Sequence, residues 1–138
     1  MLFSSLGKYK DFGLLIPRLG IGLMFFFVHG LPKLQGGPEK WAALGASVSA
    51  LGITFGHEFW GFMSAFAETA GGIVLVLGIL YRPLLLLLVI NMCVAAYSMI
   101  GGGLSKASYP IEMLVIIFAL FLLGPGKYSL DYLFFKKT

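Results

Sequence analysis

The chain has 138 residues, of which 59% are hydrophobic and only 12% are charged. This composition excludes an ordinary soluble domain and is typical of an integral membrane protein in a lipid bilayer. The net charge of +4 comes from lysines near the ends of apolar stretches, where they would meet lipid headgroups, so we expect no nucleic-acid partner. The length indicates one domain over residues 1–138.

Cys93 is the only cysteine. A single cysteine excludes an internal disulfide, a thiolate zinc site and a self-contained iron–sulfur cluster. We therefore expect no covalently bound cofactor.

The first apolar stretch, residues 12–31, is long enough to cross a bilayer, and we interpret it as an uncleaved span. Pro17 is expected near its start, and Pro32 is expected to mark its end. On a regular helix the polar residues of this stretch recur every three or four positions and share one face. That stripe consists of Arg18, Gly22, Phe25 or Phe26, His29 and Lys33.

An amphipathic segment follows the first span. Its apolar residues recur at helical spacing over residues 41–55, which is too short to cross a bilayer. The sequence therefore predicts an outer-surface helix that covers the entrance of the bundle. The apolar stripe consists of Trp41, Leu44, Val48, Leu51 and Phe55.

The second apolar stretch, residues 59–80, carries Glu68 near its centre. A charged side chain at mid-bilayer costs at least ~2.5–3.5 kcal/mol, so Glu68 should be protonated, paired or in contact with water. Arg18 is the expected counter-ion. Small residues around Glu68, among them Gly71 and Gly72, let neighbouring helices approach closely, so this helix is predicted to be the packing hub.

Two further spans are predicted, over residues 83–100 and 109–124. The third carries Asn91 near mid-depth, and residues 105–110 are expected to form a loop. Glu112 should then lie in the first turn of the fourth span, where the helix dipole would stabilise it by roughly 0.3–1 kcal/mol without any function. A functional role for Glu112 is the alternative.

The sequence thus predicts an all-α, polytopic membrane protein: a four-transmembrane-helix bundle with an additional outer-surface amphipathic helix. The distribution of basic residues indicates a plasma (inner) membrane protein with both termini in the cytoplasm. The side assigned to the cytoplasm holds Lys8, Lys10, Arg82, Lys127, Lys136 and Lys137, and the other side holds Lys33, Lys40 and Lys106.

Two interpretations of the buried polar residues are open. Arg18 and Glu68 could form an ion pair that only fixes helix register. Alternatively, Arg18, Glu68 and Asn91 converge in a polar cavity, where Arg18 donates to a quinone or anion oxygen and Glu68 exchanges protons. His29 could pair with Glu112, shuttle protons or simply be solvated.

Other candidate chemistry is weaker. His29, Glu112, His57 and Glu58 are expected on the outer side but lack metal-ligand spacing, so we predict no metal site. The aromatic residues 25–27 and Trp60 could hold a quinone ring, but lipid-facing or interhelical packing is the favoured explanation for them. No catalytic residue is identified by a nucleophile motif.

Several fragments, in order, give the chain a resemblance to the DoxX family of membrane proteins. This resemblance implies a four-helix bundle and, for some relatives, a role as the membrane subunit of quinone-linked or thiol and oxidative-stress oxidoreductases. Taken together, the polar residues of the spans give Arg18, His29, Lys33, Glu68, Asn91 and Glu112 as candidate substrate- or quinone-binding residues. The fragments are Arg18-Leu19-Gly20, His29-Gly30, Lys33-Leu34, Glu68 with Gly71-Gly72, Leu75 and Gly78, Arg82, Met92, Ala95, Glu112 and residues 124–131.

In the first functional hypothesis the redox centre comes from a soluble or membrane partner, and quinone is the expected small molecule. In the second, the chain is a non-enzymatic membrane scaffold or small-solute transporter whose buried polar residues are structural. Self-association into a homo-oligomer is left open by the sequence.

Overall fold

The computed structural model describes residues 4–135, which are predominantly helical and contain no strand. Lys136 and Lys137, which contributed to the predicted orientation, lie outside the described residues. Four helical stretches are long and apolar enough to cross a membrane, which confirms the predicted fold class. They are Leu6–Leu34, His57–Leu77, Tyr81–Ile100 and Leu104–Leu123.

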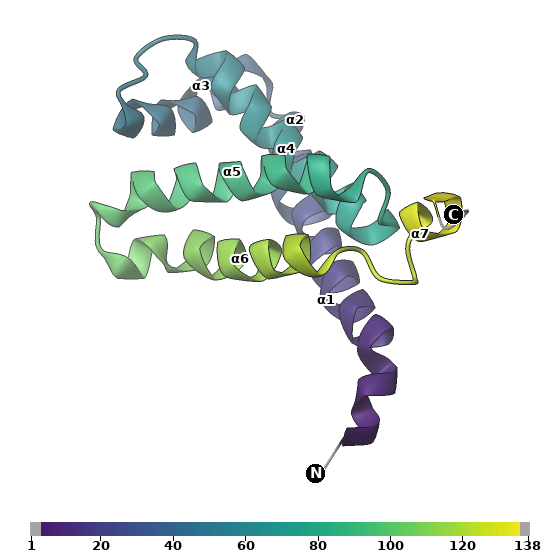
Figure 1. Cartoon of the computed structure of the whole chain (residues 1–138). Helices are drawn as coiled ribbons and strands as arrows, with labels where there is room; N and C mark the ends of the chain where they lie inside the picture. The colour runs from purple at the N-terminus through teal and green to yellow at the C-terminus, as the bar shows by residue number, and fades with distance from the viewer. Residues whose placement is uncertain (1–3, 136–138) are drawn as a thin grey trace.

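The elements follow one another with short connections (Figure 1). They are the 3-10 helix η1 (Ser4–Tyr9), α1 (Lys10–Met24), the π-helix η2 (Phe25–Gly30), α2 (Leu31–Leu34), α3 (Gly37–Gly45), the 3-10 helix η3 (Ala46–Leu51), α4 (His57–Leu77), α5 (Tyr81–Ile100), α6 (Leu104–Leu123) and α7 (Leu130–Phe135).

The helix α4 is the centre of the molecule, as its small residues predicted. It packs against α1, α3 and α5, and its most apolar window is 50% buried, compared with 22–28% in the other spans. Gly22 of α1 and Gly72 of α4 meet backbone to backbone, where a Cβ on either would lie under 3 Å from the other's carbonyl oxygen. Glycine therefore sets the distance between these two helices.

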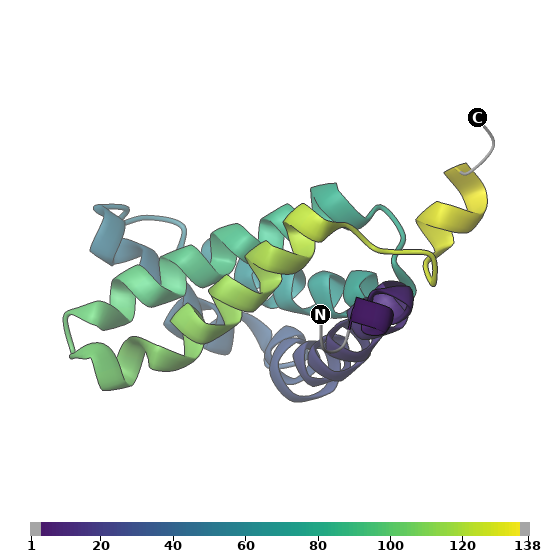
Figure 2. The ribbon, with the colours of Figure 1, turned by 60° about the horizontal axis from the view of Figure 1, so that its bottom comes forward.

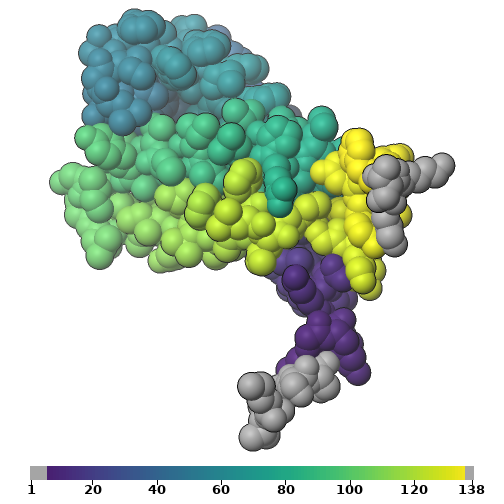
Figure 3. Space-filling view, viewed as in Figure 1, coloured from purple at the N-terminus to yellow at the C-terminus, as the bar shows by residue number. Residues whose placement is uncertain are grey.

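The helices α5 and α6 form an antiparallel hairpin that crosses α1 rather than running along it (Figures 1 and 2). In the space-filling view, α3 and η3 form the blue lobe beside the green surface of α5 (Figure 3). Within the described part of the chain, α6 packs extensively only on α5. One side of α6 is consequently left without a helical neighbour.

The first span is longer than predicted, because Pro32 does not end it. The preceding segment is a π-helix, in which the N–H of Leu31 bonds to the carbonyl of Phe26, five residues earlier. Such wide turns accommodate local irregularities and add a residue to the turn. The helix continues to Leu34, and Pro17 lies inside α1 rather than near its start.

The amphipathic segment is helical and docked on the protein, with bounds that differ from the predicted 41–55. It begins at Gly37 and ends at Leu51, where Gly52 takes a left-handed conformation (φ +82°) that terminates the helix. It lies on α4, and a Cβ added to Gly61 would collide with the backbone of Trp41. This glycine permits the close contact between α3 and α4.

The fourth span starts earlier than predicted, at Leu104 instead of Tyr109, so the expected loop over residues 105–110 is wrong. Pro110 is buried inside the helix. Its missing N–H leaves the Lys106 carbonyl free, and Lys106 is exposed at the helix end, where the loss costs least. Glu112 is therefore not in the first turn, and the helix-dipole explanation for it is wrong.

Both ends of the described chain lie at the same end of the bundle. The backbone N–H of Lys127 donates to Asp11, and Asp131 of α7 accepts the N–H groups of Leu80 and Tyr81 at 2.9 Å each. Asp131 thus caps the start of α5. Which membrane side this end faces stays a prediction.

Candidate functional site

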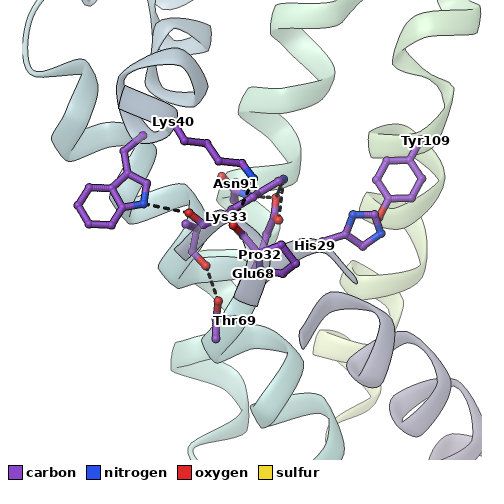
Figure 4. A network of polar contacts seen from close by, with 10 residues as sticks. His29, Pro32, Lys33, Lys40, Glu68, Thr69, Asn91 and Tyr109 are labelled. Carbon is purple, nitrogen blue, oxygen red and sulfur yellow. Dashed lines mark hydrogen bonds and ion pairs between the residues drawn. The ribbon is translucent and has the colours of Figure 1, made fainter. Parts of the chain in front are cut away.

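A buried cluster joins three helical segments around Glu68 (Figure 4). The Nζ of Lys33 lies 2.8 and 2.7 Å from the two carboxylate oxygens of Glu68, and the Nδ2 of Asn91 donates to Oε1 at 3.1 Å. The Glu68 side chain is 4% exposed and that of Lys33 is 27% exposed. A carboxylate with these partners avoids the cost of an isolated charge in the membrane.

Local packing positions Lys33 for this contact. The indole Nε1 of Trp41 donates to the Lys33 carbonyl at 3.0 Å, which ties α3 to α2. One turn earlier, Gly30 lies against the backbone of Thr69, and a Cβ there would be 2.5 Å from the Thr69 nitrogen. The first span therefore approaches α4 closely next to the ion pair between Lys33 and Glu68.

Arg18 is not the counter-ion of Glu68, which corrects the prediction. Its guanidinium is fully buried and donates only to main-chain carbonyls. Nε bonds to Leu75 at 2.9 Å, Nη2 to Val76 at 3.3 Å, and Nη1 to Tyr128 at 2.9 Å and to Pro125. Arg18 thus fastens α1 to the end of α4 and to the segment before α7.

There is a physical reason why Arg18 bonds to main-chain carbonyls rather than to Glu68. The last carbonyls of α4 have no partner in their own helix and carry the negative end of its dipole, which attracts a cation. Arg18 lies beside that end, whereas Glu68 lies farther along α4. The predicted span ended at residue 31, and Lys33, although placed on the polar stripe, was counted among the basic residues of the outer side and was not considered as the partner of Glu68. The continuous helix instead carries it to Glu68.

The predicted polar stripe of the first span divides at the π-helix. The extra residue per turn changes the direction of the side chains that follow. His29 points to α6, where its Nε2 lies 2.9 Å from the hydroxyl of Tyr109, whereas Lys33 points to α4. His29 does not pair with Glu112. Within residues 4–135 the Glu112 carboxylate is exposed and makes no hydrogen bond or ion pair.

A cavity of about 450 Å³ lies next to the cluster, between η3, α4 and α5. Asn91 belongs to its wall as well as to the Glu68 cluster. The other lining residues are almost all apolar, a composition typical of pockets for small lipid-soluble molecules. They are Ser47, Val48, Leu51, Ile53, Phe59, Trp60, Met63, Ser64, Ala67, Leu87, Ile90 and Val94.

The cavity includes only part of the predicted aromatic set. Trp60 lines it, but Phe25 is buried in the helix core and Phe27 is exposed. The contribution of η3 was missed, although its phased Val48 and Leu51 indicated a docked face. Among the described residues, no three His, Cys, Asp or Glu side chains lie close enough together to hold a metal ion.

The comparison with known families supports the pattern found in the sequence. The DoxX family model matches residues 13–101, which include most of the first span, the second and third spans, α3 and the whole Lys33–Glu68–Asn91 cluster. No curated protein and no solved structure matches the chain significantly. The match spans more than half of the chain and the fold is that of a multi-pass membrane protein, so this chain is a member of the DoxX family.

Proposed function

We propose that this protein is the membrane subunit of a quinone-linked oxidoreductase and that the cavity beside Asn91 holds the quinone ring. The observation that carries this proposal is the double position of Asn91, which lines the cavity and also donates to Glu68. A polar group in the wall of a mostly apolar cavity can orient a ligand that has a carbonyl at one end.

The amide of Asn91 suits both redox states of such a ligand. Its Nδ2 has a second hydrogen that donates to a quinone carbonyl, and its Oδ1 accepts from a quinol hydroxyl. One side chain thus keeps the ring in place through reduction or oxidation.

Lys33 and Glu68 supply the acid–base function in this proposal. Quinone reduction to quinol consumes two electrons and two protons. The ion pair lies directly behind Asn91, and the partial exposure of Lys33 gives it a connection to solvent, whereas Glu68 is enclosed. The electrons come from the redox centre of a partner protein, in agreement with the role that the family resemblance implies.

Binding of decylubiquinone to the purified protein in lipid nanodiscs tests the proposal. Trp60 lines the cavity, so its fluorescence should be quenched by the bound quinone, and the quenching should disappear in Trp60→Phe. Ala67→Phe fills the cavity from α4 and should weaken binding at least about tenfold, because a well-packed site does not absorb an added ring. Ala119→Phe, on the exposed side of α6, is the matched control.

Equal quenching in Ala67→Phe and Ala119→Phe contradicts the proposal. That result would instead favour the structural alternative, in which the cluster only holds the helices together.

A further inference from the structure

We infer that the hydroxyl of Ser64 is a second ligand-binding group of the cavity, and that Ser64 and Asn91 together hold a ring with two oxygen atoms on opposite sides. This contact, which rests on the proposed function, narrows the substrate class to 1,4-quinones and the corresponding quinols. Ser64 lines the cavity from α4, whereas Asn91 lines it from α5. Two polar side chains on different helices thus border the same space.

The hydroxyl of Ser64 is available for a ligand, whereas the other lining hydroxyl is already bonded. Ser47 donates to the carbonyl of Leu44 at 2.9 Å, and Asn91 uses one amide hydrogen on Glu68. Ser64 is only partly buried, and in the described part of the chain its hydroxyl has no hydrogen-bond partner. A hydroxyl can donate one hydrogen bond and accept others, so Ser64 has its full capacity left for a bound molecule.

Trp60 is the other lining residue with an unused donor, but it lies farther out. Its indole Nε1 is 3.8 Å from the position of a Cβ on Gly56, an exposed residue just before α4. Ser64 lies seven residues after His57, the first residue of α4, roughly 10 Å into the span at 1.5 Å per residue. The Ser64 hydroxyl is therefore the deeper of the two groups, on the side of the cavity toward Asn91.

Other hydroxyls in the helices of this chain bond back to their own backbone. Thr69 donates to the carbonyl four residues earlier, and Ser98 and Ser108 donate to the carbonyl three residues earlier. Such bonds satisfy a hydroxyl that has no other partner. Ser64 makes no bond of this kind within the described helices, and an unpaired hydroxyl at hydrocarbon depth is costly. A ligand oxygen in the cavity removes that cost.

The positions of Ser64 and Asn91 suit the two oxygens of one ring. Ser64 and Glu68 are one helical turn apart on the same face of α4. Asn91 donates to Glu68 at 3.1 Å, so it is displaced from Ser64 by about one turn, roughly 6 Å along α4. That spacing is comparable with the separation of the two oxygens of a 1,4-quinone. The hydroxyl of Ser64 donates to a quinone oxygen and accepts from a quinol hydroxyl, so the contact persists in both redox states.

Decylubiquinone binding to Ser64→Ala and Ser47→Ala in nanodiscs, measured by quenching of Trp60, tests the contact. Both replacements remove one hydroxyl from the cavity wall, but that of Ser47 is already bonded to Leu44. Ser64→Ala should weaken binding about three- to tenfold, the loss expected for one hydrogen bond, and Ser47→Ala less than about twofold. Equal losses in the two variants overturn the inference. Alanine favours a helix more than serine does, so Ser64→Ala should fold, and its thermal unfolding midpoint checks this.

The requirement for two ring oxygens is tested with ligands that differ by one hydroxyl. Each of 2-decylphenol and 3-decylphenol lacks one hydroxyl of 2-decylhydroquinone, and all three compete with decylubiquinone for the cavity. The parent chain should bind the hydroquinone more tightly than either phenol. This preference should shrink by about three- to tenfold in Ser64→Ala and persist in Ser47→Ala. An unchanged preference in Ser64→Ala overturns the inference.

Ala67→Phe separates failure of this contact from failure of the proposed function. If Ala67→Phe blocks decylubiquinone binding while Ser64→Ala binds like Ser47→Ala, the proposed function stands and the role of Ser64 falls. If the parent chain binds no decylubiquinone, or if Ala67→Phe binds it as tightly as the parent does, both fall.

Discussion

The first span carries two cations, Arg18 near its middle and Lys33 near its end, and their surroundings differ in kind. Arg18 is fully buried over the ring of Tyr81, and all of its hydrogen bonds go to backbone carbonyls, none of which can gain or lose a proton. Lys33 is partly exposed and paired with a carboxylate that also bonds Asn91 at the edge of a cavity. The hydrogen bonds of Arg18 hold helices together, whereas the second arrangement joins two ionisable side chains beside space for a ligand. Burial of a charge is therefore not by itself a sign of a functional site, and the chemical nature of its partners decides.

The largest effect is expected at Arg18. Arg18→Met removes four hydrogen bonds and leaves buried carbonyls unsatisfied, so the free energy of unfolding should fall by roughly 3–5 kcal/mol. Denaturant unfolding in detergent micelles measures the change. Arg82→Met is the control, because Arg82 is exposed and should change stability by less than about 0.5 kcal/mol. Similar losses in the two variants would remove the structural role assigned to Arg18.

Glu68→Gln should be less damaging. It leaves Lys33 without a counter-charge, but the 27% exposure of that side chain gives partial access to water. We expect a loss of roughly 2–3 kcal/mol, below the range for a fully buried pair. The same unfolding measurement should show that the double variant Lys33→Met with Glu68→Leu recovers most of this loss, because no unpaired charge is left.

The double variant also separates the two roles of the pair. Recovered stability with lost quinone turnover or binding would show that Lys33 and Glu68 act on the quinone. Recovery of both stability and function would reduce the pair to the same structural role as Arg18, and the contrast between Arg18 and Lys33 would disappear.

The smallest effect is expected at the contact between His29 and Tyr109. Tyr109→Phe removes one exposed hydrogen bond between η2 and α6, so it should destabilise the protein by about 1 kcal/mol or less. A small fall in the thermal unfolding midpoint in nanodiscs should report it. Tyr97→Phe is the matched control, since Tyr97 is exposed and has no polar partner among the described residues. A loss as large as that of Glu68→Gln would mean that this contact belongs to the functional cluster.

The sequence by itself determined the membrane class, the four spans and the central position of α4. These follow from local properties of the sequence. A helix in lipid must satisfy its backbone hydrogen bonds internally, and it needs a minimum number of apolar residues to cross the bilayer. Small residues in the second span were enough to predict its close packing. Glu68 and Asn91 were correctly expected to converge, since they lie at mid-depth in consecutive spans.

The partners of the buried charges were decided only by the tertiary structure. Arg18 bonds to carbonyls of residues 57–110 positions away in the chain, and any helix end exposes such carbonyls without a signal in its sequence. Lys33 reaches Glu68 because the π-helix before Pro32 keeps the span continuous and redirects its side chains. The cavity exists because η3 folds back over α4 and α5. Spacing along one helix cannot reveal such contacts, because they depend on how separate helices approach and on a local departure from 3.6 residues per turn.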